Sequence, residues 1–337
     1  MNKLIQREVA ELSRDFRGRF EDKRVLVTGG AGFIGSWLCE VLVEVGAKIL
    51  CLDNFSTGKR ENIKHLGGRM RLIEGDVEST SIPGKYDIIF HLASRASPEE
   101  YQMHPIETLN ANSLGTLRLL KKASKDNSTF VYASSSEIYG DAKVIPTPES
   151  YYGNVNPVGL RSCYDEGKRF GEALCIAFFR EKKVNVRIVR IFNTYGPRIR
   201  EDGFYARALP RFVSQALVNK PITIYGDGLQ TRSFCYIIDT VSAFLELSLK
   251  SDMSGEVFNV GNPDELTIIE LAKKIVRETN SSSEMQFLPA KPDDPRRRCP
   301  DIKKARELLK WEPRVKFEDG LRKTIEYFAS GRMQVKQ

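Results

Sequence analysis

The sequence predicts an α/β protein built on a doubly wound parallel sheet, with a second, smaller α/β lobe that is discontinuous in the chain. Three observations support this prediction. Residues 25–52 form a complete unit of strand, glycine turn, helix and strand; strands then alternate with helices up to about residue 196; and arginine becomes frequent beyond it. Alternating strands and helices are typical of a parallel sheet covered by helices on both faces.

Length and composition are those of a globular protein with room for two lobes, because single cores stop growing at roughly 250–300 residues. The chain has 337 residues, and its net charge of +8 favours an anionic partner, either a phosphorylated small molecule or nucleic acid. No apolar run reaches the ~18 residues of a membrane span, and no signal peptide is visible. We expect a cytoplasmic protein.

Cysteine and histidine usage argues against a disulfide framework and against a metal site. The six cysteines are scattered without paired spacing, and the three histidines form no cluster. We therefore expect buried thiols in a reducing compartment and no bound metal.

The first predicted element is an amphipathic helix within residues 2–20, where apolar side chains recur every three to five positions. It is expected to pack on the body of the protein or on another subunit. Acidic residues interrupt the basic ones in this segment, so we expect neither a membrane nor a nucleic-acid partner.

The next unit predicts a dinucleotide site. Residues 25–28 and 48–52 are apolar runs typical of buried parallel strands, and residues 36–45 have helical spacing. Between them, Gly29, Gly32 and Gly35 suit a tight turn, close approach of a pyrophosphate, and close packing of helix on strand. The unit therefore predicts a Rossmann-type domain, and the Gly-x-x-Gly spacing points to short-chain dehydrogenases/reductases.

The cofactor is expected to be NAD. Asp53 ends the second strand, where a carboxylate can bind the ribose hydroxyls of NAD and repel the 2′-phosphate of NADP. Asp76 and Val77 follow the next strand and are placed to meet the adenine. The predicted cofactor-binding residues are Gly29, Gly32, Phe33, Ile34, Gly35, Asp53, Asn54, Asp76, Val77, Leu92, Ala93 and Lys168.

The remaining elements continue the alternation. Strands are predicted at 70–73, 87–92 and 129–133, and a helix at 108–124. A helix at 236–249 and a strand at 257–260 are expected to return to the first lobe, and residues 303–330 predict two helices joined across Pro313.

A tyrosine and a lysine four residues apart, Tyr164 and Lys168, share one face of a predicted helix. A phenol has a pKa of about 10, so it acts as a base near neutral pH only if a cation stabilises its phenolate. Ser135 follows a predicted strand and can bind a hydroxyl group, and Glu137 adds a carboxylate close to it. Together these residues predict oxidation of an alcohol by hydride loss to NAD.

Arginines cluster after residue 196, around 198–211 and at 296–298. Guanidinium groups bind phosphate oxygens in bidentate fashion, so the cluster suits a diphosphate ligand. A set of surface ion pairs is the alternative interpretation.

Longer motifs make the resemblance specific. HLASRASPEEY (91–101), SSSEIYGD (134–141), YYGNVNPVGLRSCYDEGKR (151–169) and FNTYGPR (192–198) resemble the extended short-chain dehydrogenases that act on nucleotide sugars, and within them the UDP-glucuronate decarboxylases. The resemblance covers about residues 23–330. It implies that NAD oxidises C4 of the glucuronate ring, that the resulting β-keto acid loses CO₂, and that returned hydride gives UDP-xylose.

The resemblance also implies roles for single residues. Tyr164 would be the base, Lys168 its electrostatic partner, Ser135 the group that holds the C4 hydroxyl, and Glu137 a contact to the sugar ring. Family members usually dimerise through a helix bundle that includes the tyrosine helix, so a homodimer is expected. The implied substrate-binding residues are Ser97, Tyr101, Asn193, Arg232 and Arg298.

The composition and the order of the predicted elements, together with the resemblance, predict a division of the chain. It consists of an N-terminal helical extension over 1–22, an NAD-binding domain over 23–196 to which 236–262 return, a nucleotide-sugar-binding lobe over 197–235 and 263–330, and a tail over 331–337.

Three alternatives stay open. Nucleotide-sugar 4,6-dehydratases carry Asp-Glu where this chain has Ser136-Glu137, so dehydration is disfavoured. UDP-glucuronate 4-epimerases share the first oxidation, and some share the Ser-Glu pair. A non-catalytic NAD-binding protein would typically lack the tyrosine or the lysine. Arg95, Leu160 and Cys299 depart from the decarboxylase pattern and leave the step after oxidation open.

Overall fold

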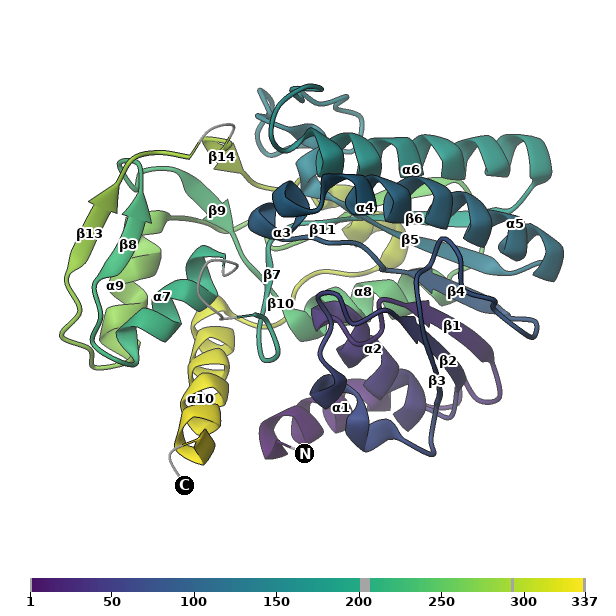
Figure 1. Ribbon diagram of the computed structural model, residues 1–337, viewed down its shortest axis with the longest axis horizontal. Coiled ribbons are helices and arrows are strands. Elements are labelled where there is room, and N and C mark those ends of the chain that lie inside the picture. The colour runs from purple at the N-terminus through teal and green to yellow at the C-terminus, as the bar shows by residue number, and fades with distance from the viewer. Residues whose placement is uncertain (1, 201–206, 292–293, 336–337) are drawn as a thin grey trace.

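The computed structural model describes residues 2–200, 207–291 and 294–335. Its centre is a seven-stranded parallel sheet in the order β11-β6-β5-β4-β1-β2-β3, so the predicted doubly wound sheet is confirmed (Figure 1). Most residues of six of these strands are buried, as expected for a sheet with both faces covered, whereas no residue of the edge strand β3 is buried. The strands are β1 (Arg24–Thr28), β2 (Lys48–Asp53), β3 (Arg71–Glu74), β4 (Ile88–His91), β5 (Thr129–Ser135), β6 (Asn185–Ile191) and β11 (Glu256–Val260).

Helices cover both faces of this sheet. One core cluster joins the sheet to the helices below it in Figure 1, and a second joins it to those above. The first group comprises α1 (Lys3–Asp15), α2 (Phe33–Glu44) and α8 (Ile237–Leu249), and the second comprises α5 (Thr116–Asp126) and α6 (Ser162–Lys182). Helix α4 (Pro105–Asn110) packs against α6.

Smaller sheets stand to the left of the large sheet in Figure 1, beyond the carboxyl ends of its strands. They come from stretches of chain on either side of α8 and β11. Because ligands of doubly wound sheets bind outside these strand ends, the arrangement places a site between the large and small sheets. The elements are β7 (Thr194–Tyr195) with β10 (Cys235–Tyr236), β8 (Ile222–Tyr225) with β13 (Met285–Leu288), β9 (Thr231–Ser233) with β12 (Glu265–Thr267) and β14 (Arg297–Arg298), and α7 (Ala208–Ala216), α9 (Ile268–Glu278) and α10 (Phe317–Val335).

Helix α1 packs on the body of the protein. Buried Glu8 accepts a hydrogen bond from the Tyr236 hydroxyl at 2.5 Å and pairs with Lys323 on α10 at 2.5 Å. The apolar face of α1 is buried against α2 and α8. In the described part of the chain, no helix has the length and apolar character needed to cross a membrane.

The structure differs locally from the predictions at three helices. The helix expected over 108–124 is interrupted by a π-helical turn at Ala111–Gly115. The first helix expected within 303–330 is only a π-helical turn at Ala305–Leu309. A short helix, α3 (Pro98–Met103), was not predicted, although Pro at its first position is a helix-start signal.

Candidate active site

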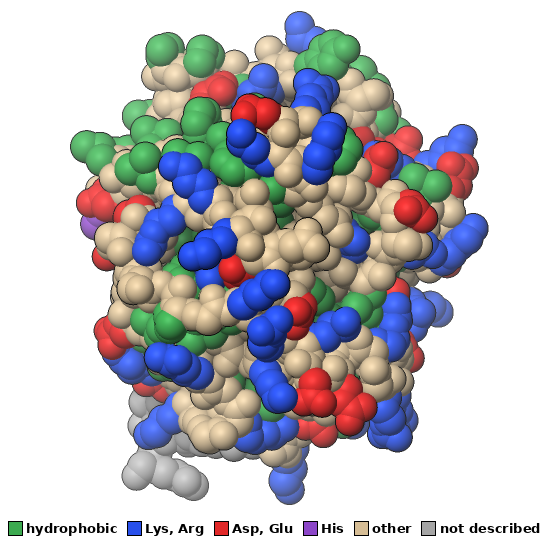
Figure 2. Space-filling view, turned by 90° about the vertical axis from the view of Figure 1, so that its right-hand side faces the viewer, with side chains coloured by type: hydrophobic (Ala, Val, Ile, Leu, Met, Phe, Trp, Pro, Cys, Tyr) green, Lys and Arg blue, Asp and Glu red, His purple; other side chains and the backbone are tan. Residues whose placement is uncertain are grey.

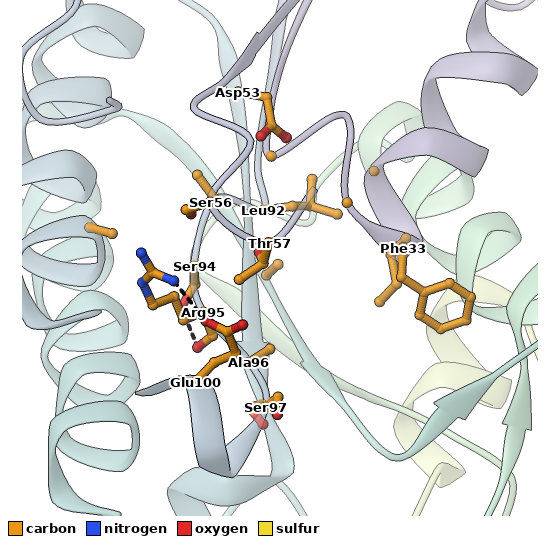
Figure 3. A pocket seen from close by; sticks show the side chains of 18 of the residues that line it. Phe33, Asp53, Ser56, Thr57, Leu92, Ser94, Arg95, Ala96, Ser97 and Glu100 are labelled. Carbon is orange, nitrogen blue, oxygen red and sulfur yellow. Dashed lines mark hydrogen bonds and ion pairs between the residues drawn. The ribbon is translucent and has the colours of Figure 1, made fainter. Parts of the chain in front are cut away.

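A cavity of about 420 Å³ opens at the carboxyl ends of the large sheet, and part of it is drawn in Figure 3. Its wall includes the glycine turn, the end of β5 and one face of α6, together with segments that lead into the smaller lobe. All predicted catalytic residues and all predicted cofactor residues line it. The sequence-predicted chemistry is therefore gathered in one place.

The glycine turn fits a pyrophosphate group. Gly29 has a φ of +72°, and a Cβ there would lie 2.8 Å from the backbone N of Ala93. A Cβ on Gly35 would lie 2.1 Å from the Gly29 carbonyl oxygen. Only glycine fits at these two positions of the turn. Helix α2 begins immediately after the turn, and the backbone N–H groups of its first turn can bind an anion.

The ribose end of the cavity is built around Asp53. Its carboxylate accepts hydrogen bonds from the backbone N–H of Ala31 and of Phe55, both at 2.8 Å. Burial raises the pKa of Asp53, whereas these two backbone donors lower it. A carboxylate has about four acceptor positions, so capacity remains for ribose hydroxyls. Asn54 donates to Asp76 at 2.6 Å, which joins two of the predicted adenosine contacts. The residues present thus fit a dinucleotide.

The base predicted from the sequence lies at the inner end of the cavity. Tyr164 on α6 is 5% exposed, and Ser135 is the last residue of β5 and 8% exposed. Burial raises the pKa of Tyr164 to about 12, although the hydroxyl of Ser135 and the charge of Arg207 lower it. In the ligand-free protein, Tyr164 is therefore a neutral phenol at pH 7.

Lys168 lies one helical turn from Tyr164, with its ammonium nitrogen 5.8 Å from the centre of the phenol ring. Nζ donates to the Ala133 carbonyl oxygen at 2.8 Å. Burial lowers the pKa of Lys168 to about 7, and the nearby Glu172 carboxylate opposes that shift. A cation beside a phenol favours the phenolate, so the pair can act as a base.

Glu137 is held between two arginines. Its carboxylate accepts from Nη1 and Nη2 of Arg298 at 2.5 and 2.9 Å and also pairs with Arg161. Burial opposes ionisation, but the two guanidinium charges hold the pKa of Glu137 well below its usual range. Glu137 is therefore a permanent anion near pH 7 and cannot serve as a proton donor.

The substrate-binding residues predicted from the resemblance divide into two groups. Ser97 and Asn193 line the cavity. Tyr101, Arg232 and Arg298 do not line it but stand behind its wall: Tyr101 stacks on the Tyr164 ring with centroids 5.0 Å apart, and Arg232 donates to Asp294 at 2.9 Å. Their contacts to a nucleotide sugar stay predictions.

Two residues at the cavity, Arg161 and Glu100, were given no role from the sequence. Arg161 precedes Tyr164 by three residues, and that helical spacing could have identified it, whereas no spacing signal marks Glu100. Arg200 and Arg207 belong to the arginine cluster that was predicted to suit a diphosphate, and both line the cavity.

Comparison with known proteins decides the family. The model of the NAD dependent epimerase/dehydratase family matches residues 25–261. The chain belongs to this family. Its cofactor is accordingly NAD, as the end of β2 predicted. The chain is also 44% identical to UDP-glucuronic acid decarboxylase 1 of Danio rerio in an alignment of 338 positions, which covers 96% of this chain and 79% of that protein.

Solved structures of epimerase/dehydratase proteins agree with the assignment. An epimerase from Methanothermobacter thermautotrophicus superposes with a TM-score of 0.88 at 29% identity, covering 97% of each chain. A variant of the UDP-glucuronic acid 4-epimerase from Bacillus cereus, solved with UDP-4-deoxy-4-fluoro-glucuronic acid and NAD, gives a TM-score of 0.82 at 29% identity. That match covers 91% of this chain and 99% of the other.

Proposed function

We propose that this protein converts UDP-glucuronate to UDP-xylose and CO₂ through a transient 4-keto sugar. The proposal is supported mainly by one observation: Ser135 and Tyr164 line the same cavity as the residues predicted to bind the dinucleotide. Identity of 44% to a UDP-glucuronic acid decarboxylase over nearly the whole chain supports the same reaction.

The first step is oxidation at C4. Bound NAD accepts hydride from C4 and returns it at the end of the cycle. Ser135 holds the C4 hydroxyl, and Tyr164 takes its proton. Because the pKa of Tyr164 is about 12 in the ligand-free protein, the charge of Lys168 is needed to stabilise the phenolate.

The second step is loss of CO₂. With a ketone at C4, the carboxylate on C5 belongs to a β-keto acid; the bond from C5 to the carboxyl carbon breaks, and its electron pair passes to the C4 oxygen as an enolate. Tyr164, now protonated, donates a hydrogen bond to that oxygen and stabilises the developing charge. A proton from solvent then adds to C5, which restores the ketone. Return of hydride to C4, with the proton held by Tyr164 going to the C4 oxygen, re-forms the hydroxyl.

The charged groups suit a substrate with several negative charges. Arg161, Arg232 and Arg298 share two carboxylates, Glu137 and Asp294, so these five side chains together carry an excess positive charge. We propose that Asn193 and Arg232 hold the UDP, and that Arg298 lies near the diphosphate or the sugar. Ser97 and Tyr101 would line the sugar pocket, and Glu137 would contact the sugar ring and help to position it.

A 4-epimerase is the second candidate. The same C4 oxidation serves both reactions, and the fold superposes well on a UDP-glucuronic acid 4-epimerase. In that case the 4-keto sugar turns over in the site and is reduced before CO₂ leaves, so the product is UDP-galacturonate.

We further propose a cytoplasmic homodimer of the two-lobed chain. Exposed apolar side chains lie on neighbouring helices, including Ile106 on α4 and Phe170 on α6, which are 69% and 51% exposed. Figure 2 shows hydrophobic side chains gathered along the upper part of one face, while Lys and Arg spread over much of the rest. The buried, unpaired thiols of all six cysteines fit a reducing compartment.

Replacing Tyr164 with Phe tests the assignment. The variant keeps the stacked ring but loses the group that takes the proton, so CO₂ release should fall by about a thousandfold. NAD affinity, measured by calorimetry, should stay close to wild type. Normal CO₂ release by the variant would show that another group is the base.

A further inference from the structure

Three charged side chains on the cavity wall have no role in the proposed chemistry. Glu100 on α3 accepts from Arg95 at 2.8 Å with one carboxylate oxygen and from Arg200 at 2.8 Å with the other. All three line the cavity that contains Tyr164 and Ser135. Figure 3 shows the Arg95 guanidinium group turned toward Glu100.

The carboxylate of Glu100 joins two walls of the cavity. Arg95 lies in the segment that follows β4 of the large sheet, whereas Arg200 follows β7 and lies 100 residues from Glu100 along the chain. A second bond crosses between the same two walls, because Arg207 donates to the Ala96 carbonyl oxygen at 2.7 Å. The bridge from Arg95 through Glu100 to Arg200 therefore closes one side of the site.

Burial gives this bridge more weight than a surface ion pair. The side chain of Glu100 is 8% exposed, and those of Arg95 and Arg200 are 16% and 25% exposed. Charge-assisted hydrogen bonds in such partly dry surroundings are strong, so removing the Glu100 carboxylate would take away the group that links Arg95 to Arg200.

The proposed reaction makes a closed wall useful. Hydride taken from C4 in the first step is returned to C4 in the last, so the reduced cofactor and the 4-keto sugar must both stay bound in between. If either one leaves, the cycle ends with a released ketone and an enzyme that has lost its oxidised cofactor. Both molecules occupy the one cavity that the bridge borders.

We propose that Glu100 is a positioning residue, whose bridge to Arg95 and Arg200 retains the cofactor and the 4-keto sugar until hydride has been returned. Glu100 touches no reacting atom and acts through the two arginines. The inference rests on the proposed function as far as the keto sugar is concerned. Retention of NAD does not depend on which product is formed.

The test compares Glu100→Gln with Glu107→Gln. Glu107 lines the same cavity, but its side chain is 60% exposed and lies 3.9 Å from His104. Its substitution therefore removes a negative charge from the cavity without changing the bridge. Each holoprotein is diluted into buffer without NAD and without sugar, and dissociation of NAD is followed by rapid filtration. Glu100→Gln should release NAD about tenfold faster than wild type, corresponding to one lost interaction of moderate strength, and Glu107→Gln should not.

During turnover of UDP-glucuronate, Glu100→Gln should also accumulate free NADH, read by its absorbance, in proportion to a released 4-keto sugar trapped with borohydride. If Glu100→Gln released NAD and NADH at the wild-type rates, the proposal would be overturned. If that variant did not fold, as judged by its melting temperature, Arg200→Gln breaks the same bridge and carries the same expectation. Failure of the wild type to release CO₂ would overturn the proposed function and leave the NAD dissociation result intact.

Discussion

Replacing Glu137 with Gln tests whether the buried ion pairs of Glu137 stabilise the protein more than an exposed ion pair does. Glu137 is 15% exposed, and its partners Arg298 and Arg161 are 8% and 11% exposed. The amide keeps the shape of the side chain but removes the charge, and its NH₂ group turns a donor toward a guanidinium donor. Breaking a buried network by removing one partner costs about 3–5 kcal/mol, because the other charges stay buried without compensation.

The apparent free energy of unfolding should therefore fall by about 3–5 kcal/mol in Glu137→Gln. Urea unfolding followed by tryptophan fluorescence measures it, since Trp37 and Trp311 are both buried. Asp227→Asn is the matched control. Asp227 also makes a bidentate pair, with Arg296 at 2.9 Å, but both side chains are about half exposed, so stability should stay close to wild type.

Unfolding of Glu137→Gln at the same urea concentration as wild type would show that the Glu137 ion pairs do not stabilise the protein. That result would mean that the two arginines find water or other acceptors, and that Glu137 does not organise the site. The same variant should bind UDP-glucuronate more weakly, because both arginines lose the carboxylate that orients them.

Three further predictions follow from the geometry. Gly35→Ala should weaken NAD binding at least about tenfold in a calorimetric titration, because its Cβ would meet the Gly29 carbonyl oxygen at 2.1 Å. Burial, and after it the charge of Glu137, raises the pKa of Asp165 from 3.8 to about 7. Between these two pH values the folded state binds a proton that the unfolded state has lost. The contribution of Asp165 to wild-type stability should therefore fall as the pH rises from 3.8 to about 7. Asp165→Asn should abolish that fall in melting temperature, and an unchanged pH profile would contradict it. Ile106 is one of the exposed side chains assigned to the proposed dimer contact, so Ile106→Asp should turn that proposed dimer into a monomer in light scattering, and a wild type that is already a monomer would contradict the proposal.

Local patterns in the sequence predicted the parts of the site that local geometry determines. The glycine turn and Asp53 lie on one strand, turn, helix and strand unit, whose spacing is sufficient to predict a dinucleotide site. Tyr164 and Lys168 lie one turn apart on α6, and helical periodicity alone places them on one face. Ser135 was expected after the strand and is its last residue, a difference within the usual uncertainty of strand ends.

Tertiary contacts determine the rest. Glu137, Arg161 and Arg298 come from three segments, so their network depends on how the smaller lobe docks on the large sheet. The stacking of Tyr101 on Tyr164 likewise depends on α3, which the sequence did not reveal as a helix. Lobe boundaries and residue contacts to the sugar stay predictions for the same reason.

Conversion of UDP-glucuronate to UDP-xylose is tested most directly by an NMR time course of the purified protein with UDP-glucuronate and NAD. The time course follows the anomeric signals of the sugar together with released CO₂. UDP-xylose signals should replace those of UDP-glucuronate, with one CO₂ released for each UDP-xylose formed. UDP-galacturonate without CO₂ would contradict the decarboxylase and identify a 4-epimerase.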